Sequence, residues 1–370
     1  MPTDDDVVFS DLRLPVSLDS DGGPEFRELA EVRAVVSEAT FGNRDQAETA
    51  EELLPYWQDP WTTRRMILAR IGGKLVGFGS VVMPSEPGST VAVPRVAVLP
   101  DYRHRGIGRA LAEAVIRIAE AAGRNTLRTW AEHSPGAGGE PIPAPTGFGS
   151  VPSDDPGARF LIAAGWQLEQ VMRVSRLDLT AASSAIPGLL ETARRASEGY
   201  EAITWTGATP EELLPDMAML HAAMSTDPPA GGLQIDEEIW TPERVVDVDT
   251  RNAESGYLTI NTGARHLETG KLVGYTDFLV PSNPDQPVLQ EDTIVLRGHR
   301  GHRVGMLVKA TNIIELMKLA PSARLVYTTN AEENRPMLGV NEALGFESIG
   351  YEGGWRESDE TAAARGARIR

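Results

Sequence analysis

The first candidate chemistry in this 370-residue chain is anion binding by a short glycine-containing segment. Arg103-His104-Arg105-Gly106-Ile107-Gly108-Arg109 follows an apolar run and leads into an amphipathic stretch, Gly108–Ala122. The first turn of a helix presents unpaired N–H groups and the positive end of the helix dipole, and both favour a phosphate. The glycines remove side chains that would keep a diphosphate away, and the arginines add positive charge. The segment therefore predicts a diphosphate site at the start of a helix.

The spacing distinguishes this segment from two other phosphate loops. A dinucleotide fingerprint needs a further glycine at position 111, where the chain has Leu111. A P-loop needs Gly-Lys followed by Ser or Thr, which is also absent from the segment. The segment therefore matches neither the dinucleotide-binding motif nor the P-loop, and a different phosphate ligand is expected.

The same segment ends a long internal repeat with an offset of 197 residues. Gly73-Lys74-Leu75-Val76-Gly77 recurs as Gly270-Lys271-Leu272-Val273-Gly274, and 13 of the 39 aligned positions from Gly73 to Leu111 are identical. A repeat of this length indicates a duplicated domain rather than a short repeat unit. In the second copy of the loop, Arg303 stands where the first copy has Gly106.

The elements that must position these loops alternate between helices and strands in both halves. The helices expected from apolar periodicity are Glu25–Ala39, Gln46–Tyr56, Gly108–Ala122, Leu189–Ala196, Pro210–Met224, Met306–Leu319 and Glu333–Leu344. The expected strands are Arg65–Ile71, Leu75–Val82, Val91–Val98, Leu127–Ala131, Leu168–Leu179, Glu201–Trp205, Gly256–Asn261, Leu272–Val280, Asp292–Leu296, Arg324–Thr329 and one from Phe346. The segment Ser134–Ala158 has 12 Gly or Pro in 25 residues, which predicts a lid or a disordered insertion without regular structure.

The strand-loop-helix pattern from Val96-Ala97-Val98 to Arg109 resembles the acetyl-CoA loop of the GNAT N-acetyltransferase superfamily. The resemblance covers both halves and implies a tandem GNAT protein with a layout similar to mycothiol synthases. The implied fold is of the α/β (α+β) type, with two GNAT domains that each have a twisted mixed sheet and helices on both faces. The expected boundaries are 1–180 for the first domain, 181–198 for a linker helix and 199–370 for the second, with a mobile tail from about 357.

The resemblance also implies how acetyl-CoA would be held. The backbones of Val96, Ala97 and Val98 would pair with the pantetheine arm, and N–H groups from Arg105 to Arg109 would hold the diphosphate. The neighbouring strand, Thr126–Ala131, would diverge and leave a gap where the thioester meets an amine. In the second half the implied cofactor-binding residues are Val295, Arg300, Arg303, Gly305 and Asn334.

Two alternatives are open for Arg303 in the second loop. An arginine in a position that needs a positive φ lowers the affinity for CoA, whereas a guanidinium that reaches a CoA phosphate raises it. The later GNAT motif that ends in Gly-Phe is better matched by Asn334–Phe346 than by Ala164-Gly165-Trp166 in the first half. Each half therefore retains a part of the pattern that the other has lost.

Direct acyl transfer needs a base for the amine and an acid or a stabilising group for the thiolate. In many GNAT enzymes a tyrosine of the later motif is the acid, but Leu161 and Asn341 occupy its positions here. The candidate bases are Glu132 and His133 in the first half and Glu291 in the second. The alternative for each of these is a solvated residue at a strand end or in a loop.

Composition excludes several other mechanisms. The chain has no cysteine, so disulfides, thiolate zinc sites and a cysteine nucleophile are excluded, and no metal is predicted. The net charge of −18 argues against nucleic acids and anionic membranes and is compatible with a cationic amine. With no apolar run that could span a membrane and an acidic start, a cytoplasmic location is expected, and both a monomer and a homodimer are open.

The sequence therefore predicts an acetyl-CoA-dependent N-acetyltransferase that acts on a small amine by direct acyl transfer. In one alternative only the C-terminal half is catalytic, through Glu291, and the first half is a structural CoA-binding half. In the other alternative the chain is a non-catalytic CoA-binding sensor, because the usual acid is missing from both halves.

Overall fold

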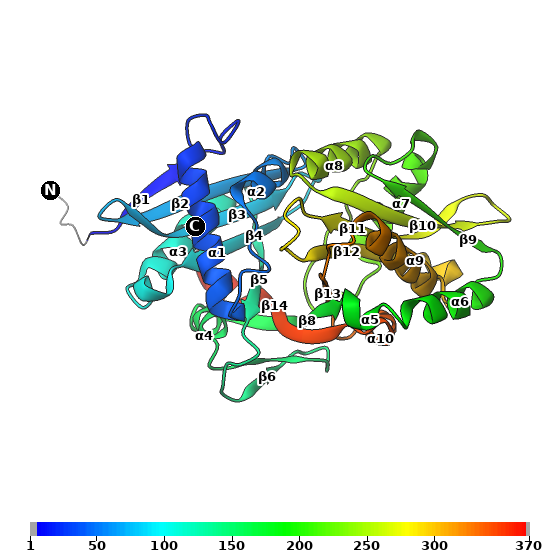
Figure 1. Cartoon of the computed structure of the whole chain (residues 1–370). Coiled ribbons are helices and arrows are strands. Elements are labelled where there is room, and N and C mark those ends of the chain that lie inside the picture. The colour runs from blue at the N-terminus through cyan, green and yellow to red at the C-terminus, as the bar shows by residue number, and fades with distance from the viewer. Residues whose placement is uncertain (1–5, 368–370) are drawn as a thin grey trace. The chain divides into compact units, whose positions relative to one another are not determined.

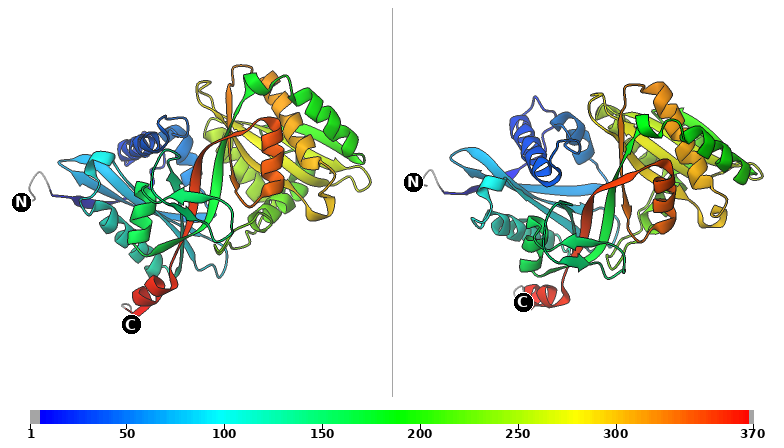
Figure 2. Two further views of the ribbon diagram at one scale, coloured as in Figure 1. Left: turned by 90° about the horizontal axis from the view of Figure 1, so that it is seen from below. Right: turned by 60° about the horizontal axis from the view of Figure 1, so that its bottom comes forward.

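The computed structural model describes residues 6–367, which belong to two compact units. Unit 1 comprises Met1–Met172, Ala230–Asp236 and Gly350–Arg370, and unit 2 comprises Arg173–Pro229 and Glu237–Ile349. In each unit, helices cover both faces of a mixed sheet, so the predicted fold class is confirmed (Figures 1 and 2).

The sheet of unit 1 includes a strand from the end of the chain. Its order is β1-β2-β3-β4-β5-β14-β8. The bounds are β1 Val8–Leu12, β2 Thr62–Ile71, β3 Lys74–Pro84, β4 Val91–Val98, β5 Thr126–His133, β14 Glu347–Glu357 and β8 Trp166–Asp178. Strand β14 pairs antiparallel with β5, whereas β4 and β5 are parallel. Residues more than 200 positions apart in the sequence thus meet in one sheet.

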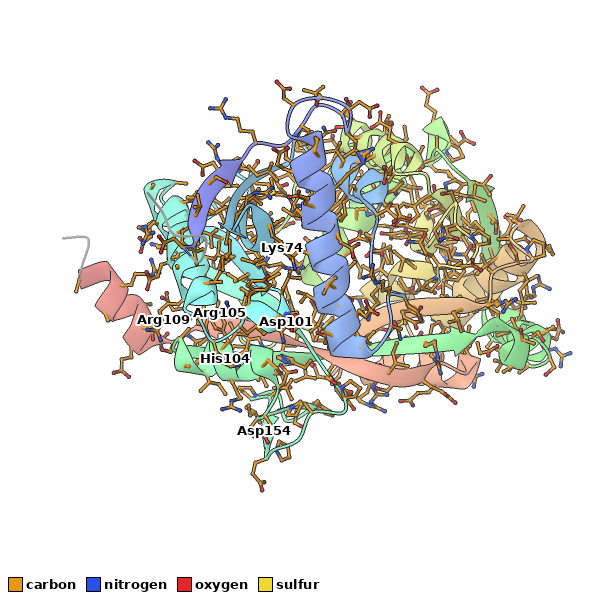
Figure 3. All side chains as sticks on the ribbon, turned by 60° about the vertical axis from the view of Figure 1, so that its left-hand side comes forward. Lys74, Asp101, His104, Arg105, Arg109 and Asp154 are labelled. Atoms are coloured by element: carbon orange, nitrogen blue, oxygen red, sulfur yellow. The ribbon has the colours of Figure 1, made fainter. Side chains whose placement is uncertain are left out.

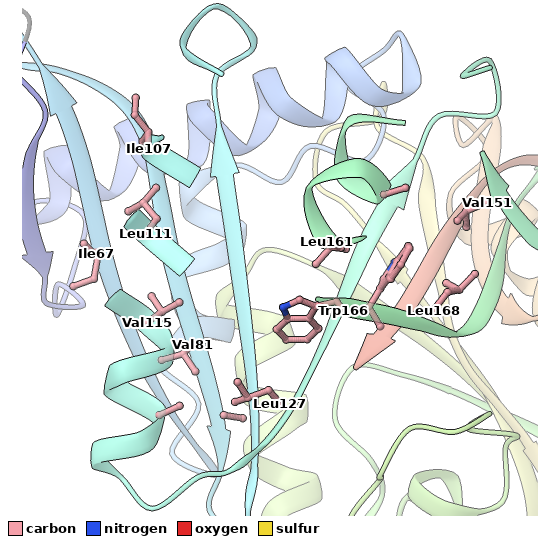
Figure 4. Close-up of a cluster of buried hydrophobic side chains, with 14 of the residues drawn as sticks. Ile67, Val81, Ile107, Leu111, Val115, Leu127, Val151, Leu161, Trp166 and Leu168 are labelled. Carbon is pink, nitrogen blue, oxygen red and sulfur yellow. The ribbon is translucent and has the colours of Figure 1, made fainter. Parts of the chain in front are cut away.

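Alternation along β2 directs two sets of side chains to the two faces of this sheet. Met66 and Leu68 belong to the core under α1 (Gly23–Phe41) and α2 (Ala50–Trp57). Ile67 and Ala69 belong to the core with α3 (Ile107–Ala121) and α4 (Pro156–Ala163), whose buried side chains appear in Figure 4. Apolar residues on both faces of a strand are what a sheet between two helical layers requires.

The repeated glycines have the same surroundings in both copies. Gly73 and Gly270 both adopt a positive φ, +82° and +71°, in the turn before a strand. A Cβ added at Gly77 would lie 2.7 Å from the Ala97 carbonyl oxygen. At Gly274 it would lie 2.7 Å from the Ile294 carbonyl oxygen. The repeat is therefore retained where the backbone has no room for a side chain.

Two segments that the sequence predicts to be irregular contain regular structure. The segment Ser134–Ala158 contains a small hairpin, β6 (Pro141–Pro143) with β7 (Ser150–Pro152), and the fully buried Val151 packs into the core of unit 1. The expected mobile tail contains α11 (Asp359–Ala367), whose Arg365 pairs with Glu120 and Glu357 at 2.8 Å each. Local composition did not predict the hairpin or the helix, because packing and ion pairs with residues distant in the sequence stabilise them.

Unit 2 repeats the same architecture. Its strand order is β8-β13-β12-β11-β10-β9, with bounds β13 Leu325–Ala331, β12 Val288–Val295, β11 Leu272–Val280, β10 Leu258–His266 and β9 Tyr200–Thr206. Helices α7 (Leu214–Thr226) and α8 (Pro242–Glu254) cover one face, and α6 (Ile186–Ala196) and α9 (Val304–Leu319) cover the other. Two short helices, α5 (Leu179–Ala182) and α10 (Arg335–Leu344), complete it. Helix α6, which the sequence places in a linker, packs here against α9.

Candidate active site

The first glycine loop leads from the end of β4 into α3. After a short 3₁₀ turn, Pro100–Tyr102, the backbone takes a positive φ at His104 (+62°) and again at Gly106 (+82°), which is the N-cap of α3. The first bond of the helix runs from the Ala110 N–H to the Gly106 carbonyl, at 3.0 Å. The N–H groups of residues 106–109 therefore have no acceptor within the helix. A Cβ at Gly106 would meet no atom within 4 Å, so this helix end faces open space.

The second loop follows the same backbone path although its glycine has moved. Gly301 has a φ of +87° and Arg303 a φ of +54°, at the positions of His104 and Gly106 in the repeat. Each copy thus has two left-handed residues, of which one is a glycine, and the order of the two is exchanged. Arg303 therefore does not abolish the loop conformation.

Replacing Arg303 by glycine is expected to stabilise unit 2. A non-glycine residue in the left-handed region costs roughly 1–2 kcal/mol, partly offset by the greater freedom of glycine in the unfolded chain. We expect R303G to raise the free energy of unfolding by about 1 kcal/mol, and G106R to lower it by a similar amount. Calorimetric melting of both variants measures this. A lower melting temperature for R303G would show that contacts of the guanidinium outweigh the strain.

The first arginine of each loop braces the loop against its strand. The Nε of Arg103 donates to the Val98 carbonyl at 3.1 Å, and that of Arg300 donates to the Val295 carbonyl at 2.8 Å. In unit 2, Asp227 also accepts from Arg300 at 2.8 Å. These two arginines therefore hold the loop, in addition to the phosphate-binding role predicted for them.

Further basic side chains surround the start of α3. Arg105 lies over the ring of Tyr102, 5.2 Å from its centroid, and Lys74 lies at the same distance. Figure 3 shows His104, Arg105 and Arg109 grouped at this end of the helix. Positive side chains and helix N–H groups converge there, which is the arrangement that an anionic diphosphate requires.

Strands β4 and β5 separate immediately beside the loop. They pair only through Val91 with Thr126 and Ala92 with Leu127. Beyond that point, β4 continues to pair with β3 as far as Val98, so its other edge has no β5 partner. An open edge can accept an extended chain as an added strand. The expected divergence is thus present next to Val96, Ala97 and Val98, and unit 2 repeats it between β12 and β13, where only Val288 and Leu289 pair.

Two glutamates face each other across β5 and β14 in unit 1. Glu132 and Glu352 are directly opposed in the antiparallel register, where side chains lie roughly 5 Å apart at Cβ. The guanidinium of Arg95, on the open part of β4, lies 3.9 Å from Glu352 Oε1. Glu352 and Arg95 have no recognisable local motif, and sequence analysis missed both.

The surroundings of this pair raise the pKa of both carboxyls. Burial raises the pKa of Glu352 to about 7, with Arg95 lowering it and Glu132 raising it further. Glu132 is solvent-accessible, but the atoms crowded around it desolvate its carboxylate and raise its pKa as well. A carboxylate with a pKa near neutrality is suited to take a proton from an amine at neutral pH.

His133 has a structural place instead of the predicted catalytic one. Its side chain is fully buried, with Nδ1 2.8 Å from Asp155 Oδ1 and Nε2 accepting from Trp355 Nε1 at 3.2 Å. Burial raises the pKa of Asp155, but the hydrogen bond to His133 outweighs this and lowers it overall. With both ring nitrogens occupied, His133 has no atom with which to accept a proton from a substrate.

In unit 2 a β-bulge gives the two adjacent carboxylates on β12 different surroundings. Thr276 pairs with Thr293 and Phe278 with Gln290, so Glu291 and Asp292 together oppose the single residue Asp277. Asp292 accepts from the Tyr275 hydroxyl, whereas the side chain of Glu291 is exposed on the strand. The predicted base Glu291 thus lies beside a hydrogen-bonded network that contains its neighbour.

The residues of the later motif are placed at α10. Asn334 is the N-cap of this helix and accepts from the Met337 N–H at 3.4 Å. Asn341, at the position of the usual tyrosine, is buried, and its Nδ2 donates to Asn330 Oδ1 at 2.6 Å. An amide cannot release a proton to a thiolate, so Asn341 does not replace the phenol as an acid.

Other features of the described residues lie outside these sites. A hollow of about 660 Å³ in unit 2 is lined by residues before β12 and at the start of β13, at the opposite end of β12 from the loop. Within residues 6–367 no three His, Asp or Glu side chains gather as metal ligands would. In the same range no helix has the length and apolar character of a membrane span.

Comparison with known proteins shows what this chain is similar to. Residues 30–137 match the sequence model described as the Acetyltransferase (GNAT) family. No curated protein matches the chain. Among solved structures, a tandem GNAT protein from the clavulanic acid biosynthesis pathway, without AcCoA, is 27% identical with a TM-score of 0.72 and covers 95% of this chain and 99% of its own. A GCN5-related N-acetyltransferase from Sphaerobacter thermophilus is 17% identical with a TM-score of 0.58, over 94% of this chain and 95% of its own. Residues 30–137 are therefore similar to the GNAT acetyltransferase family, and the chain has, over nearly its whole length, a fold similar to that of a tandem GNAT protein.

Proposed function

We propose that unit 1 is an acetyl-CoA-dependent N-acyltransferase for a small amine. The observation that carries this proposal is the arrangement around β4. The helix end with open N–H groups follows this strand, its edge toward β5 is unpaired, and the Glu132–Glu352 pair lies on the next two strands. In this one unit the helix end suits a diphosphate, the open strand edge suits a pantetheine arm, and the glutamate pair suits an acceptor amine.

The glutamate pair supplies the proton transfer that the reaction needs. The amine reaches the site largely as an ammonium ion and must lose a proton before it attacks the thioester carbonyl carbon. As the C–N bond forms and the C–S bond breaks, the proton moves to the Glu132–Glu352 pair, and the thiolate recovers a proton from this pair or from water. The raised pKa of Glu352, about 7, places its proton affinity between that of an ordinary carboxylate and that of an amine. No phenol is required by this scheme, which is consistent with Leu161 and Asn341 at the usual position.

The charges around the pair are of both signs. Arg95 and Arg33 lower the pKa of Glu132, whereas Glu48, which pairs with Arg33 at 3.0 Å, raises it. The whole chain carries a net charge of −18, which attracts amines and repels polyanions. The acceptor class that follows is a small primary amine.

Blocking each loop separately tests the donor site. Gly108 and Gly305 are equivalent in the repeat and lie in the first turns of α3 and α9. A Cβ at Gly108 would lie 3.3 Å from the edge of the Phe160 ring, which is partly exposed and able to shift, and one at Gly305 would lie 3.9 Å from Val295. We expect calorimetric titration with acetyl-CoA to show that G108W weakens one site at least tenfold and that G305W leaves this site intact.

The rate of CoA release tests the same assignment of the donor site. Because the chain has no cysteine, a thiol reagent detects released CoA without a background from the protein. We expect G108W to lose most of the CoA release seen with a panel of primary amines. Full release in G108W, or acetyl-CoA binding that is unchanged by it, would remove the first loop as the catalytic donor site.

A further inference from the structure

A second set of hydrogen-bonded polar side chains lies in unit 2, on the sheet face that α7 and α8 cover (Figure 1). The Tyr275 hydroxyl donates to Asp292 Oδ2 at 2.5 Å and lies 2.9 Å from His221 Nδ1. Because the hydroxyl proton goes to the carboxylate, the Nδ1–H of His221 must be the donor in the second contact. This arrangement leaves Nε2 as the basic nitrogen of the imidazole.

The His221 ring is held in place, and within residues 6–367 its Nε2 has no hydrogen-bond partner. The ring stacks on Trp240 with 4.2 Å between centroids and an angle of 14° between the planes. The contacts of the ring within the described residues are made through Nδ1 and through stacking. The side chain is 13% exposed, so solvent reaches it. An oriented imidazole with one free nitrogen is the usual form of a general base.

The protonation states of Tyr275 and Asp292 agree with this role. Burial and the negative charge of Asp292 hold the pKa of Tyr275 well above its ordinary value, so the phenol keeps its proton. Burial raises the pKa of Asp292, but the imidazole of His221, with Nδ1 3.6 Å from Oδ2, and the hydrogen bond from Tyr275 outweigh it and leave the pKa below its ordinary value. The carboxylate is therefore ionised and can stabilise an imidazolium through the phenol.

The network lies beside the opening between β12 and β13. Asp292 is at the bulge of β12, three residues after Leu289, where pairing with β13 ends. The second glycine loop follows the same strand and keeps the left-handed backbone of the first loop. In unit 1 the equivalent positions are Phe78 and Arg95, so the two units carry different chemistry on the same framework.

We propose that unit 2 is a second acyl-transfer centre, in which His221 is the general base and Tyr275 and Asp292 position it. The inference rests on the proposed function for its donor, an acyl-CoA thioester. The amine nitrogen attacks the thioester carbonyl carbon, the C–N bond forms and the C–S bond breaks. The amine proton moves to His221 Nε2, and the imidazolium returns it to the thiolate. The indole of Trp240, which also lies 4.4 Å from the guanidinium of Arg244, holds the imidazole in this orientation.

A variant with a blocked first loop isolates this second centre. In the G108W chain we follow thiol release from acetyl-CoA with ethylamine, spermidine and 2-phenylethylamine. We expect release with at least one of these amines to persist, to fall at least 100-fold when H221Q is added, and to fall about tenfold with Y275F, mainly through kcat. The control H266Q removes a histidine of unit 2 that hydrogen-bonds to Thr269, and it should stay within twofold.

The tautomer of His221 gives a readout that does not depend on turnover. The chain has six histidines, so their imidazole ¹⁵N signals can be assigned one by one. We expect His221 in the Nδ1–H form in the wild type, and a mixture of both tautomers in Y275F, because the phenol that accepts from Nδ1 is missing. A His221 with its proton on Nε2 in the wild type would overturn the inference regardless of any activity.

The kinetic outcomes separate this inference from the proposed function. If G108W keeps full activity with every amine, the proposed function of unit 1 fails and unit 2 is the active centre. If G108W is inactive while the wild type is active, or if H221Q has no effect in G108W, the inference for unit 2 fails and unit 1 alone catalyses. If the wild type releases no CoA with any amine, both fail.

Discussion

Replacing Glu352 by glutamine lowers the kcat of amine acetylation by unit 1 about 10²- to 10³-fold, the usual contribution of a general base. Glutamine has nearly the same shape, so the pairing of β14 with β5 and the acetyl-CoA affinity should be retained. Thiol release in the G305W chain, where the second loop is blocked, measures the effect on unit 1. The matched control is E347Q, an exposed glutamate on the same strand, which should stay within twofold.

The pH dependence of the same reaction identifies the proton acceptor. Because the pKa of Glu352 is raised to about 7, its carboxylate forms as the pH rises through 7, and kcat should rise over that range. Glu132 is opposite, so the apparent value belongs to the pair. E352Q should remove this rise or shift it to lower pH. A profile that is unchanged in E352Q would assign the ionisation to another group.

Replacing Lys309 by methionine stabilises the protein, by roughly 3 kcal/mol at pH 6. Lys309 lies on α9 and is almost completely buried, with Nζ 5.5 Å from the ring centroid of Phe346. Burial lowers its pKa from 10.5 to about 7, although the nearby Asp277 acts in the opposite direction. The equivalent position in unit 1 is Ala112. A long apolar side chain can fill the same space without a charge.

The sign of this effect follows from proton binding. The unfolded chain binds the proton of this lysine up to about pH 10, whereas the folded protein releases it above about pH 7. The native state is therefore penalised progressively as the pH falls from 10 to 7, and the penalty is complete below 7. Denaturant unfolding of K309M and the wild type at pH 6 and pH 9.5 measures the difference, which should be larger at pH 6. K318M, an exposed lysine on the same helix, is the control, and a destabilised K309M would contradict the argument.

Much of the fold follows from local sequence patterns. The strands Val91–Val98 and Leu272–Val280 were predicted with the bounds that the structure has, because they are short apolar runs with clear ends. Helix α8, Pro242–Glu254, was missed because its sequence is mostly polar and its apolar side is narrow. The hairpin β6–β7 was missed because glycine and proline dominate its composition, although Val151 is fully buried.

The glycine loop and the glutamate pair differ in how far apart in the sequence their residues lie. The glycine loop could be predicted because all its functional atoms come from one continuous segment, residues 103–109. Glu132 could be named as a candidate, but its partner Glu352 could not, because 220 positions separate the two residues and only strand pairing opposes them. His133 was assigned to catalysis because sequence does not show that Asp155 and Trp355 occupy both of its nitrogens.

Local sequence patterns are enough to show that this protein has two copies of one α/β framework, each with a loop of left-handed residues at a helix start. These features depend on backbone geometry within a few residues, and glycine, proline and apolar spacing encode that geometry directly. The side chains that we propose as proton acceptors could be identified only from the folded chain. A pKa near 7 at Glu352 and a free Nε2 at His221 arise from burial and from partners on other strands, and these are set by the packing of distant segments.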